Sequence, residues 1–197
     1  MIAVIDSGVA NLASVLAALS RLGASMQVTT NPELVREADR IVIPGVGAAA
    51  AAMEELRRNG LVEVLRAAQQ PVLGICLGMQ LLFARSDEGQ GVECLGVIPG
   101  RIRKLETTPL FPVPHMGWNN IRFDGDAHPL LRGIADSSFM YFAHSFAAPM
   151  LDCAVAYAEY GERFGAIVAQ DNFFGCQFHP ERSGPVGLKL IENFLDL

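Results

Sequence analysis

The sequence is poor in positive charge and in long apolar runs, and each shortage excludes a class of protein. Its 197 residues carry 15 Lys and Arg against 21 Asp and Glu, for a net charge of −6. No basic block could follow a phosphate backbone, so we expect no nucleic-acid partner. The most apolar stretch, residues 41–53, is short and interrupted by Pro44, so we expect no membrane partner. The residues before Asp6 are predicted to form a strand and not a signal peptide, which favours a cytoplasmic location.

Cysteine is also scarce, and its spacing and context argue against a zinc site and against a disulfide framework. The four cysteines form no CxxC pair and no spacing typical of zinc ligands. Without a secretion signal, we expect no disulfide framework. A buried, unpaired thiol is the ordinary interpretation of a cysteine, and we retain it for all but Cys76. The other three are Cys94, Cys153 and Cys176.

The residues that are present predict a compact α/β fold. About half of them, 51%, are apolar, which suits a single domain over residues 1–197. In the first half, apolar strands alternate with segments of helical periodicity. This order predicts an open, mostly parallel sheet with helices on both faces. The expected strands are 2–5, 26–29, 40–43 and 72–75, and the expected helices are 12–22, 48–58, 61–68 and 77–84.

The second half of the chain has a different pattern. From Gly96 to about Ile121, short β-like runs alternate with Pro and Gly, which predicts an antiparallel insertion. Further strands are expected at 139–143, 153–158, 166–169 and 173–178, and a closing helix at 187–197.

The segment around Cys76 is the most informative in the chain. A strand runs into Gly74-Ile-Cys76-Leu-Gly78 and then directly into a helix, which is the nucleophile-elbow arrangement with Cys in place of Ser. The turn is tight, so small residues must flank it. At a helix N-terminus, free N–H groups and the helix dipole stabilise a thiolate. The N–H of Leu77 could also face an oxyanion.

A thiolate nucleophile needs a proton-transfer partner, and His179 is the best candidate. Gln177, His179 and Glu181 are two residues apart, so in an extended chain they share one face. A carboxylate beside an imidazole fixes its tautomer and supports its charge. Cys176 is expected to face the other way. Of the remaining histidines, His128 precedes Pro129 in a polar turn and is expected to be solvated. His115 and His144 could be functional, but neither has an adjacent carboxylate to orient it.

The turn Pro44-Gly-Val-Gly47 follows another strand. It lacks the third glycine of a dinucleotide-binding fingerprint and the Gly-Lys-Ser/Thr of a P-loop, so phosphate binding is poorly supported. A Gly-rich turn beside an elbow could instead supply a second oxyanion N–H.

Together, the segments 74–80 and 178–181 resemble those of the class I, triad-type glutamine amidotransferases. Pro44 to Gly47 and the segment Pro114-His-Met-Gly-Trp118-Asn narrow the resemblance to the glutaminase subunits of imidazole glycerol phosphate synthases. The opening segment, residues 5–12, also fits, and the resemblance covers essentially the whole chain. It implies a flavodoxin-like fold and a heterodimer with a barrel-shaped synthase (cyclase) subunit in histidine biosynthesis. It implies no metal or organic cofactor.

The resemblance also implies a role for each matching residue. Cys76 would attack L-glutamine to form a glutamyl thioester, with His179 as general base and acid and Glu181 orienting it. Gly47 and Leu77 match the oxyanion positions. The matching glutamine-binding residues are Gln80, Ser145 and Phe146, and the matching synthase-facing residues are Asn11, Trp118 and Arg182.

Trp118 is the only tryptophan, and its flanks predict a surface position. Pro114, Gly117 and Asn119 predict a turn, and turns lie at the surface. An indole on such a turn is typical of an interface anchor. The chain departs from the family pattern at Ser7, Ala10, Ala49 and Phe146, and none of these departures touches the proposed triad.

Three alternatives remain open from the sequence. The chain could serve another amidotransferase pathway, such as anthranilate or pyridoxal phosphate synthesis, although the 115–118 segment argues against this. It could be a cysteine peptidase on a related fold. It could also be a non-catalytic scaffold for a synthase that uses free ammonia, but an intact triad argues against that.

Overall fold

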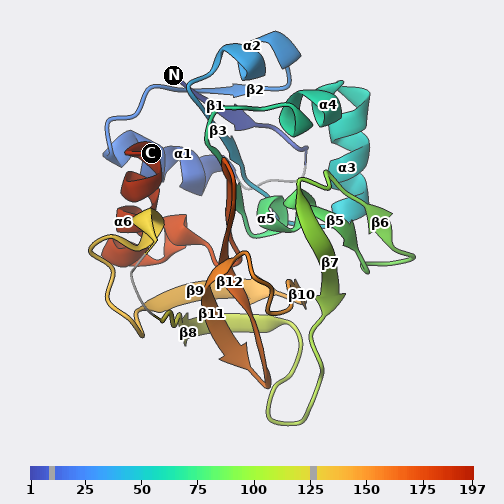
Figure 1. The fold of residues 1–197 in the computed structure, drawn as a ribbon, viewed down its shortest axis with the longest axis vertical. Helices are drawn as coiled ribbons and strands as arrows, with labels where there is room; N and C mark the ends of the chain where they lie inside the picture. The colour runs from blue at the N-terminus through green and yellow to red at the C-terminus, as the bar shows by residue number, and fades with distance from the viewer. Residues whose placement is uncertain (9–11, 125–127) are drawn as a thin grey trace.

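The computed structural model describes residues 1–8, 12–124 and 128–197, and a seven-stranded sheet lies at its centre (Figure 1). The order of the strands is β11-β12-β13-β4-β3-β1-β2. Neighbours from β13 to β2 are parallel, whereas β12 and β11 add an antiparallel edge. The mostly parallel open sheet is therefore confirmed. The strands are β1 (Ile2–Ile5), β2 (Met26–Thr29), β3 (Arg40–Ile43), β4 (Val72–Ile75), β11 (Ala154–Tyr160), β12 (Glu162–Gln170) and β13 (Phe173–Cys176).

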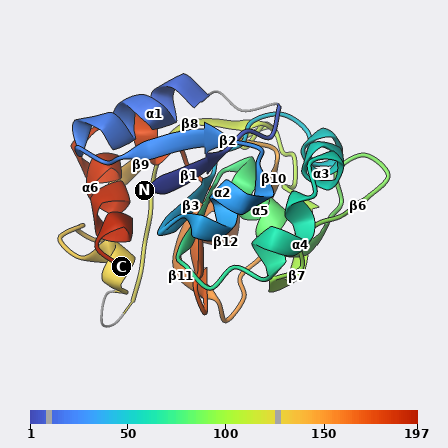
Figure 2. The ribbon, with the colours of Figure 1, turned by 90° about the horizontal axis from the view of Figure 1, so that it is seen from above.

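Helices cover both faces of this sheet, as Figure 2 shows from above. On one face lie α1 (Leu12–Arg21) and α6 (Gly184–Leu195), and on the other lie α3 (Ala49–Arg58), α4 (Leu61–Arg66) and α5 (Leu77–Leu82), with α2 (Pro32–Glu37) packed against α4. Side chains of a strand alternate between its faces. In β1, Ile2 and Val4 therefore enter one core cluster, while Ala3 and Ile5 enter the other. Each cluster fixes one helical layer against the sheet.

Two smaller sheets lie at the carboxyl ends of the parallel strands. One has the order β10-β7-β5-β6, formed by β5 (Phe83–Ser86), β6 (Val92–Glu93), β7 (Ile98–Lys104) and β10 (Phe146–Ala147). The other pairs β8 (His115–Asn120) with β9 (Phe139–His144). Among the residues that the structure describes, no helix has both the length and the apolar character needed to cross a membrane.

Some boundaries differ from the sequence-based expectations. The helix expected over 77–84 ends at Leu82, because Phe83 is buried and begins β5. The insertion is not wholly antiparallel, since β5 and β7 pair in parallel. The closing helix begins three residues earlier than expected, at Gly184. Strand β13 ends at Cys176, two residues early, and the short 3-10 helix η2 (Pro180–Arg182) follows.

The segment expected to be a turn around Trp118 is instead the strand β8. Its six residues pair one-for-one with β9, from His115 opposite His144 to Asn120 opposite Phe139. The prediction of a turn was wrong because the long-range pairing outweighs the local turn preference of Gly and Asn. The predicted surface position is confirmed, since Trp118 is 58% exposed.

Candidate active site

The nucleophile elbow forms at the junction of β4 and α5. Cys76 has φ 52° and ψ −107°, a strained conformation for a residue with a side chain. The flanking glycines permit it: a Cβ on Gly78 would lie 1.8 Å from the Ile43 carbonyl oxygen, and one on Gly74 would lie 2.6 Å from backbone atoms of Gly78. Such strain is typical of functional sites. The sequence prediction of a tight turn between small residues is confirmed.

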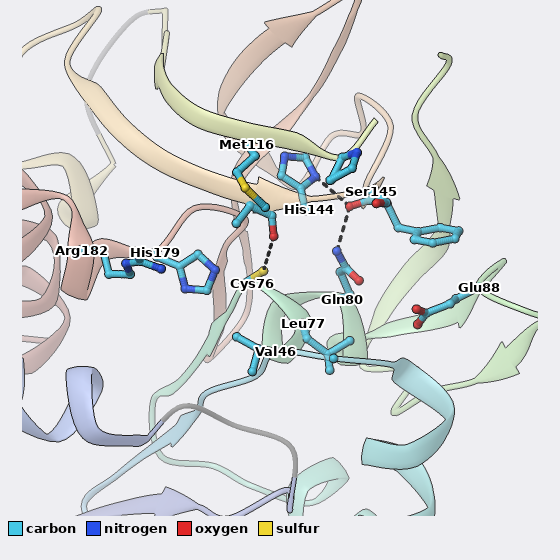
Figure 3. Close-up of a pocket in the computed structure, with 14 residues that line it drawn as sticks. Val46, Cys76, Leu77, Gln80, Glu88, Met116, His144, Ser145, His179 and Arg182 are labelled. Atoms are coloured by element: carbon cyan, nitrogen blue, oxygen red, sulfur yellow. Dashed lines mark hydrogen bonds between the residues drawn. The ribbon is translucent and has the colours of Figure 1, made fainter. Parts of the chain in front are cut away.

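His179 and Glu181 form the expected pair. Nδ1 of His179 lies 2.9 Å from Oε1 of Glu181, and both side chains are buried. Figure 3 shows the imidazole directed toward Cys76. Burial opposes charge on the ring, but hydrogen bonds to Cys76 and Glu181 outweigh it and raise the pKa of His179. The arrangement favours the charged form of the His179 ring.

The route by which Glu181 reaches His179 differs from the predicted one. The expected strand does not continue through this segment, because Pro180 starts the 3-10 helix η2 and offers no N–H for a ladder. Contacts with β9 hold His179 instead. Its N–H donates to the Tyr141 carbonyl at 2.8 Å, and its carbonyl accepts from the Ser183 hydroxyl at 2.7 Å. That hydroxyl in turn accepts from the Tyr141 N–H at 2.9 Å.

The other cysteines lie in environments that oppose reactivity. Cys176 is fully buried, and burial raises the pKa of its thiol well above the usual range. Burial also raises the pKa of Cys94 to about 11, and it raises that of Cys153. A thiol that stays protonated is a poor nucleophile.

A cavity of about 340 Å³ opens above Cys76. In Figure 3, His179 and Arg182 lie at one end, and Gln80 and Glu88 lie toward the other. Its volume is in the range of small-molecule sites. Among the described residues, no group of three His, Cys, Asp or Glu side chains could hold a metal ion. The lining residues are Val46, Gly47, Cys76, Leu77, Gln80, Glu88, Pro114, Met116, Ala143, His144, Ser145, Phe146, His179 and Arg182.

All three residues matched to substrate binding line this cavity. Gln80, however, is buried and bonded within the wall: its side-chain N–H groups donate to the Phe146 carbonyl at 2.8 Å and to Oε1 of Gln177 at 3.1 Å. Ser145 and Phe146 are half-buried. Ser145 lies between β9 and β10, and Phe146 begins β10.

The two oxyanion candidates also border the cavity. Gly47 adopts φ 95°, a left-handed conformation that suits glycine. The N–H of Leu77 donates weakly to the Gly45 carbonyl at 3.4 Å. A substrate oxygen could compete for this long bond.

Sequence reasoning missed Glu88 and the His115–His144 pair. Oε2 of Glu88 accepts a 2.6 Å hydrogen bond from the Ala49 N–H at the start of α3, which fixes an acidic group on the cavity wall. Nδ1 of His115 lies 3.0 Å from Nε2 of His144. Burial lowers the pKa of His115 to about 4 and is the main cause that lowers that of His144 to about 3. Nothing local marked these residues, since their partners are distant in sequence.

An exposed apolar face flanks the cavity on β8 and β9. Met116, Trp118 and Phe139 are 66%, 58% and 60% exposed. Arg182 lies over the Tyr141 ring at 4.5 Å, and Tyr141 meets Trp118 edge-on at 6.1 Å. Two of the matched interface residues, Trp118 and Arg182, thus come together through Tyr141. Asn11 and the departure at Ala10 lie outside the described residues.

Comparisons with known proteins agree with this geometry. The family model of class-I glutamine amidotransferases matches residues 3–197. "Imidazole glycerol phosphate synthase subunit HisH" of Yersinia pseudotuberculosis is 47% identical over 196 residues, covering 100% of this chain and 99% of that protein. The protein of the same name from Idiomarina loihiensis is 49% identical over 196 residues, covering 100% and 97%. A solved structure of a glutamine amidotransferase has a TM-score of 0.77 at 16% identity, covering 100% of this chain and 98% of that one, which supports the fold.

Proposed function

Because the chain belongs to the class-I glutamine amidotransferase family, we propose that it is the glutaminase subunit of an imidazole glycerol phosphate synthase. As one amidotransferase domain, it hydrolyses L-glutamine to glutamate and ammonia. It delivers the ammonia to a synthase subunit, which forms imidazole glycerol phosphate and aminoimidazole carboxamide ribotide. The observation that carries the proposal is a strained Cys76 beside a buried His179–Glu181 pair in one cavity.

The geometry supports a thioester mechanism. The Cys76 thiolate attacks the side-chain carbonyl carbon of glutamine, and N–H groups near Gly47 and Leu77 stabilise the oxyanion. The His179 imidazolium gives its proton to the departing nitrogen, so the C–N bond breaks and ammonia leaves. Neutral His179 then takes a proton from water, whose oxygen displaces the Cys76 sulfur to release glutamate. Glu181 supports the charge on the ring in each half.

The cavity is chemically suited to a free amino acid. Glu88 provides a carboxylate at the end away from His179, where it would attract a substrate ammonium group. The distance between the charged end and the reacting sulfur would then select for an amide-bearing side chain. A peptide has no free ammonium at that position, so this feature favours a glutaminase over a peptidase.

We place the synthase subunit on the exposed face of β8 and β9. That face is apolar, it borders the cavity, and the Tyr141 carbonyl connects it to His179 by accepting a backbone hydrogen bond. Ammonia released at Cys76 would therefore emerge next to the bound partner. Clusters of exposed aromatic side chains are typical of protein interfaces.

Replacing Cys76 by Ala tests the proposed function. The mutant complex should lose glutamine-dependent synthesis, while the synthase subunit retains synthesis from added ammonia. Activity would be measured with each nitrogen source, and Cys94→Ala serves as the control. Glutamine-dependent synthesis at the unmutated rate would remove Cys76 from the mechanism.

Replacing Trp118 by Ala tests the proposed docking face. We expect binding to the synthase subunit to weaken by about 1–4 kcal/mol, the range for interface hot spots. The melting temperature of the isolated chain should hardly change, since the side chain is largely exposed. Titration and thermal unfolding measure the two quantities. Unchanged affinity with a large loss of fold stability would refute the assignment.

A further inference from the structure

A chain of buried polar groups leads from β8 to the sulfur of Cys76. At one end, Nε2 of Gln177 lies 3.7 Å from the Cys76 Sγ, and Gln177 is fully buried. Gln80 holds Gln177 and also binds the Phe146 carbonyl, which His144 approaches from the other side (Figure 3). The catalytic triad already described uses none of these three side chains.

The Phe146 carbonyl decides which group donates and which accepts in each hydrogen bond between it and the Cys76 sulfur. A carbonyl can only accept, so Gln80 must present its NH₂ group to it, at 2.8 Å. The second hydrogen of that group then points to the Gln177 side chain at 3.1 Å, which must present its oxygen. The amide nitrogen of Gln177 is consequently the atom that faces Cys76.

The same carbonyl orders the histidines on its other side. His144 Nδ1 lies 2.9 Å from it and must carry a hydrogen, so Nε2 of a neutral His144 accepts from Nδ1 of His115. Nε2 of His115 then accepts from the Asn119 amide at 3.4 Å. The low pKa values of both rings agree with a neutral pair. The histidines thus help hold the carbonyl on which the direction of the chain depends.

We propose that Gln177 is a further catalytic residue, which donates a hydrogen bond to the Cys76 thiolate in a direction fixed by Gln80 and the Phe146 carbonyl. This inference rests on the proposed role of Cys76 as the nucleophile. A buried thiolate needs donors to offset its lost hydration. His179 supplies one, and Gln177 supplies a second that carries no charge. The Ala143 carbonyl, 3.8 Å from the sulfur, favours the protonated thiol and so makes the second donor more important.

The pH dependence of Cys76 alkylation in the isolated chain tests the proposal. Iodoacetamide reacts with the thiolate, so its rate against pH gives the apparent pKa of Cys76, and peptide mapping identifies the labelled residue. Gln177→Met removes the donor, and Gln177→Glu places a carboxylate beside the sulfur. Gln69→Glu adds the same charge at an exposed position and is the control. The other titratable groups around Cys76 stay unchanged in every variant: Glu88, His144, Cys176, His179, Glu181 and Arg182.

We expect the apparent pKa of Cys76 to rise by about 1 unit in Gln177→Met and about 2 units in Gln177→Glu. The control should match the unmutated chain. Identical profiles in Gln177→Met and the unmutated chain, with similar melting temperatures, would overturn the role of Gln177. Failure to label Cys76 in the unmutated chain would instead contradict its role as the nucleophile.

A second measurement needs no variant, which guards against loss of folding. Nitrogen-15 NMR of the imidazole rings reports which nitrogen carries the proton. At neutral pH, His115 and His144 should both be neutral with the proton on Nδ1. A proton on Nε2 of His144 would leave the Phe146 carbonyl without its imidazole donor and would overturn the proposed arrangement at the histidine end of the chain.

Discussion

Two groups of buried histidines in this protein hold opposite charge states. His179, His115 and His144 are only 5%, 3% and 5% exposed. His179 faces a thiol and a carboxylate, which raise its pKa despite burial. The His115–His144 pair faces a backbone carbonyl and aromatic rings, and burial lowers both pKa values. Burial disfavours the protonated, charged form of all three rings. The hydrogen-bonding partners therefore decide which ring is charged.

The contrast between charged and neutral histidines also matters for function, because one cavity is lined by a ring of each kind. His144 and His179 both line the cavity above Cys76. The charge on His179 contributes to lowering the pKa of His144. A charged ring can transfer a proton, whereas a neutral ring of fixed tautomer can hold a carbonyl in place. Each histidine is thus suited to one task by its neighbours.

The largest effect should come from removing the charged ring. His179→Ala should lower the rate of glutamine hydrolysis by about 10³-fold, within the range of general acid–base catalysis. Glu181→Gln should lower it less, by about 10²-fold, since an amide still accepts a hydrogen bond but does not compensate charge. His115→Gln is the matched control and should stay within about 10-fold of the unmutated rate. Equal activity in Glu181→Gln and the unmutated protein would leave Glu181 without a catalytic role.

A carboxylate placed beside the His115–His144 pair should favour the charged form of His115, as Glu181 does for His179. Asn119 lies 3.4 Å from Nε2 of His115, so Asn119→Asp would place a carboxylate where the triad has Glu181. We expect the pKa of His115 to rise by about 2 units, measured by NMR titration. Asn120→Asp, on the other face of β8, is the control. An unchanged pKa of His115 in Asn119→Asp would show that burial alone controls the charge on this ring.

The smallest effect concerns stability in mild acid. The folded pKa values of His115 and His144 lie below the ordinary value of 6.5, so the unfolded chain binds more protons as pH falls from about 6.5 to 4. Each ring should therefore cost about 2 kcal/mol of unfolding free energy between pH 6 and 4.5. The folded pKa of His179 is raised, so its stabilisation is already complete below pH 6.5 and is lost only at higher pH.

Urea unfolding at the two pH values measures this difference. The unmutated chain should lose about 2 kcal/mol more than His115→Gln does, because the variant lacks one of the two rings. Equal losses in both proteins would mean that His115 titrates normally in the folded state.

Local sequence determined the parts of the protein that depend on neighbouring residues. Periodicity predicted the parallel strands and most of the helices, because alternation and helical spacing follow from backbone geometry. The elbow at Cys76 was predictable because Gly74 and Gly78 leave the space that its turn requires. The pairing of His179 with Glu181 was also predicted, although a 3-10 turn and not a strand brings them together.

Only the tertiary structure decided which distant groups share the site. His115 meets His144 across 29 residues, Gln80 meets Gln177 across 97, and Gln177 meets Cys76 across 101. These contacts depend on how β8, β9 and β13 pack around the elbow, and no local propensity encodes them. The same is true of Trp118, whose sequence flanks predict a turn but whose pairing with β9 makes a strand. A motif is fixed by adjacent dihedral angles, whereas a charge state or a bond direction is fixed by partners that the fold brings together.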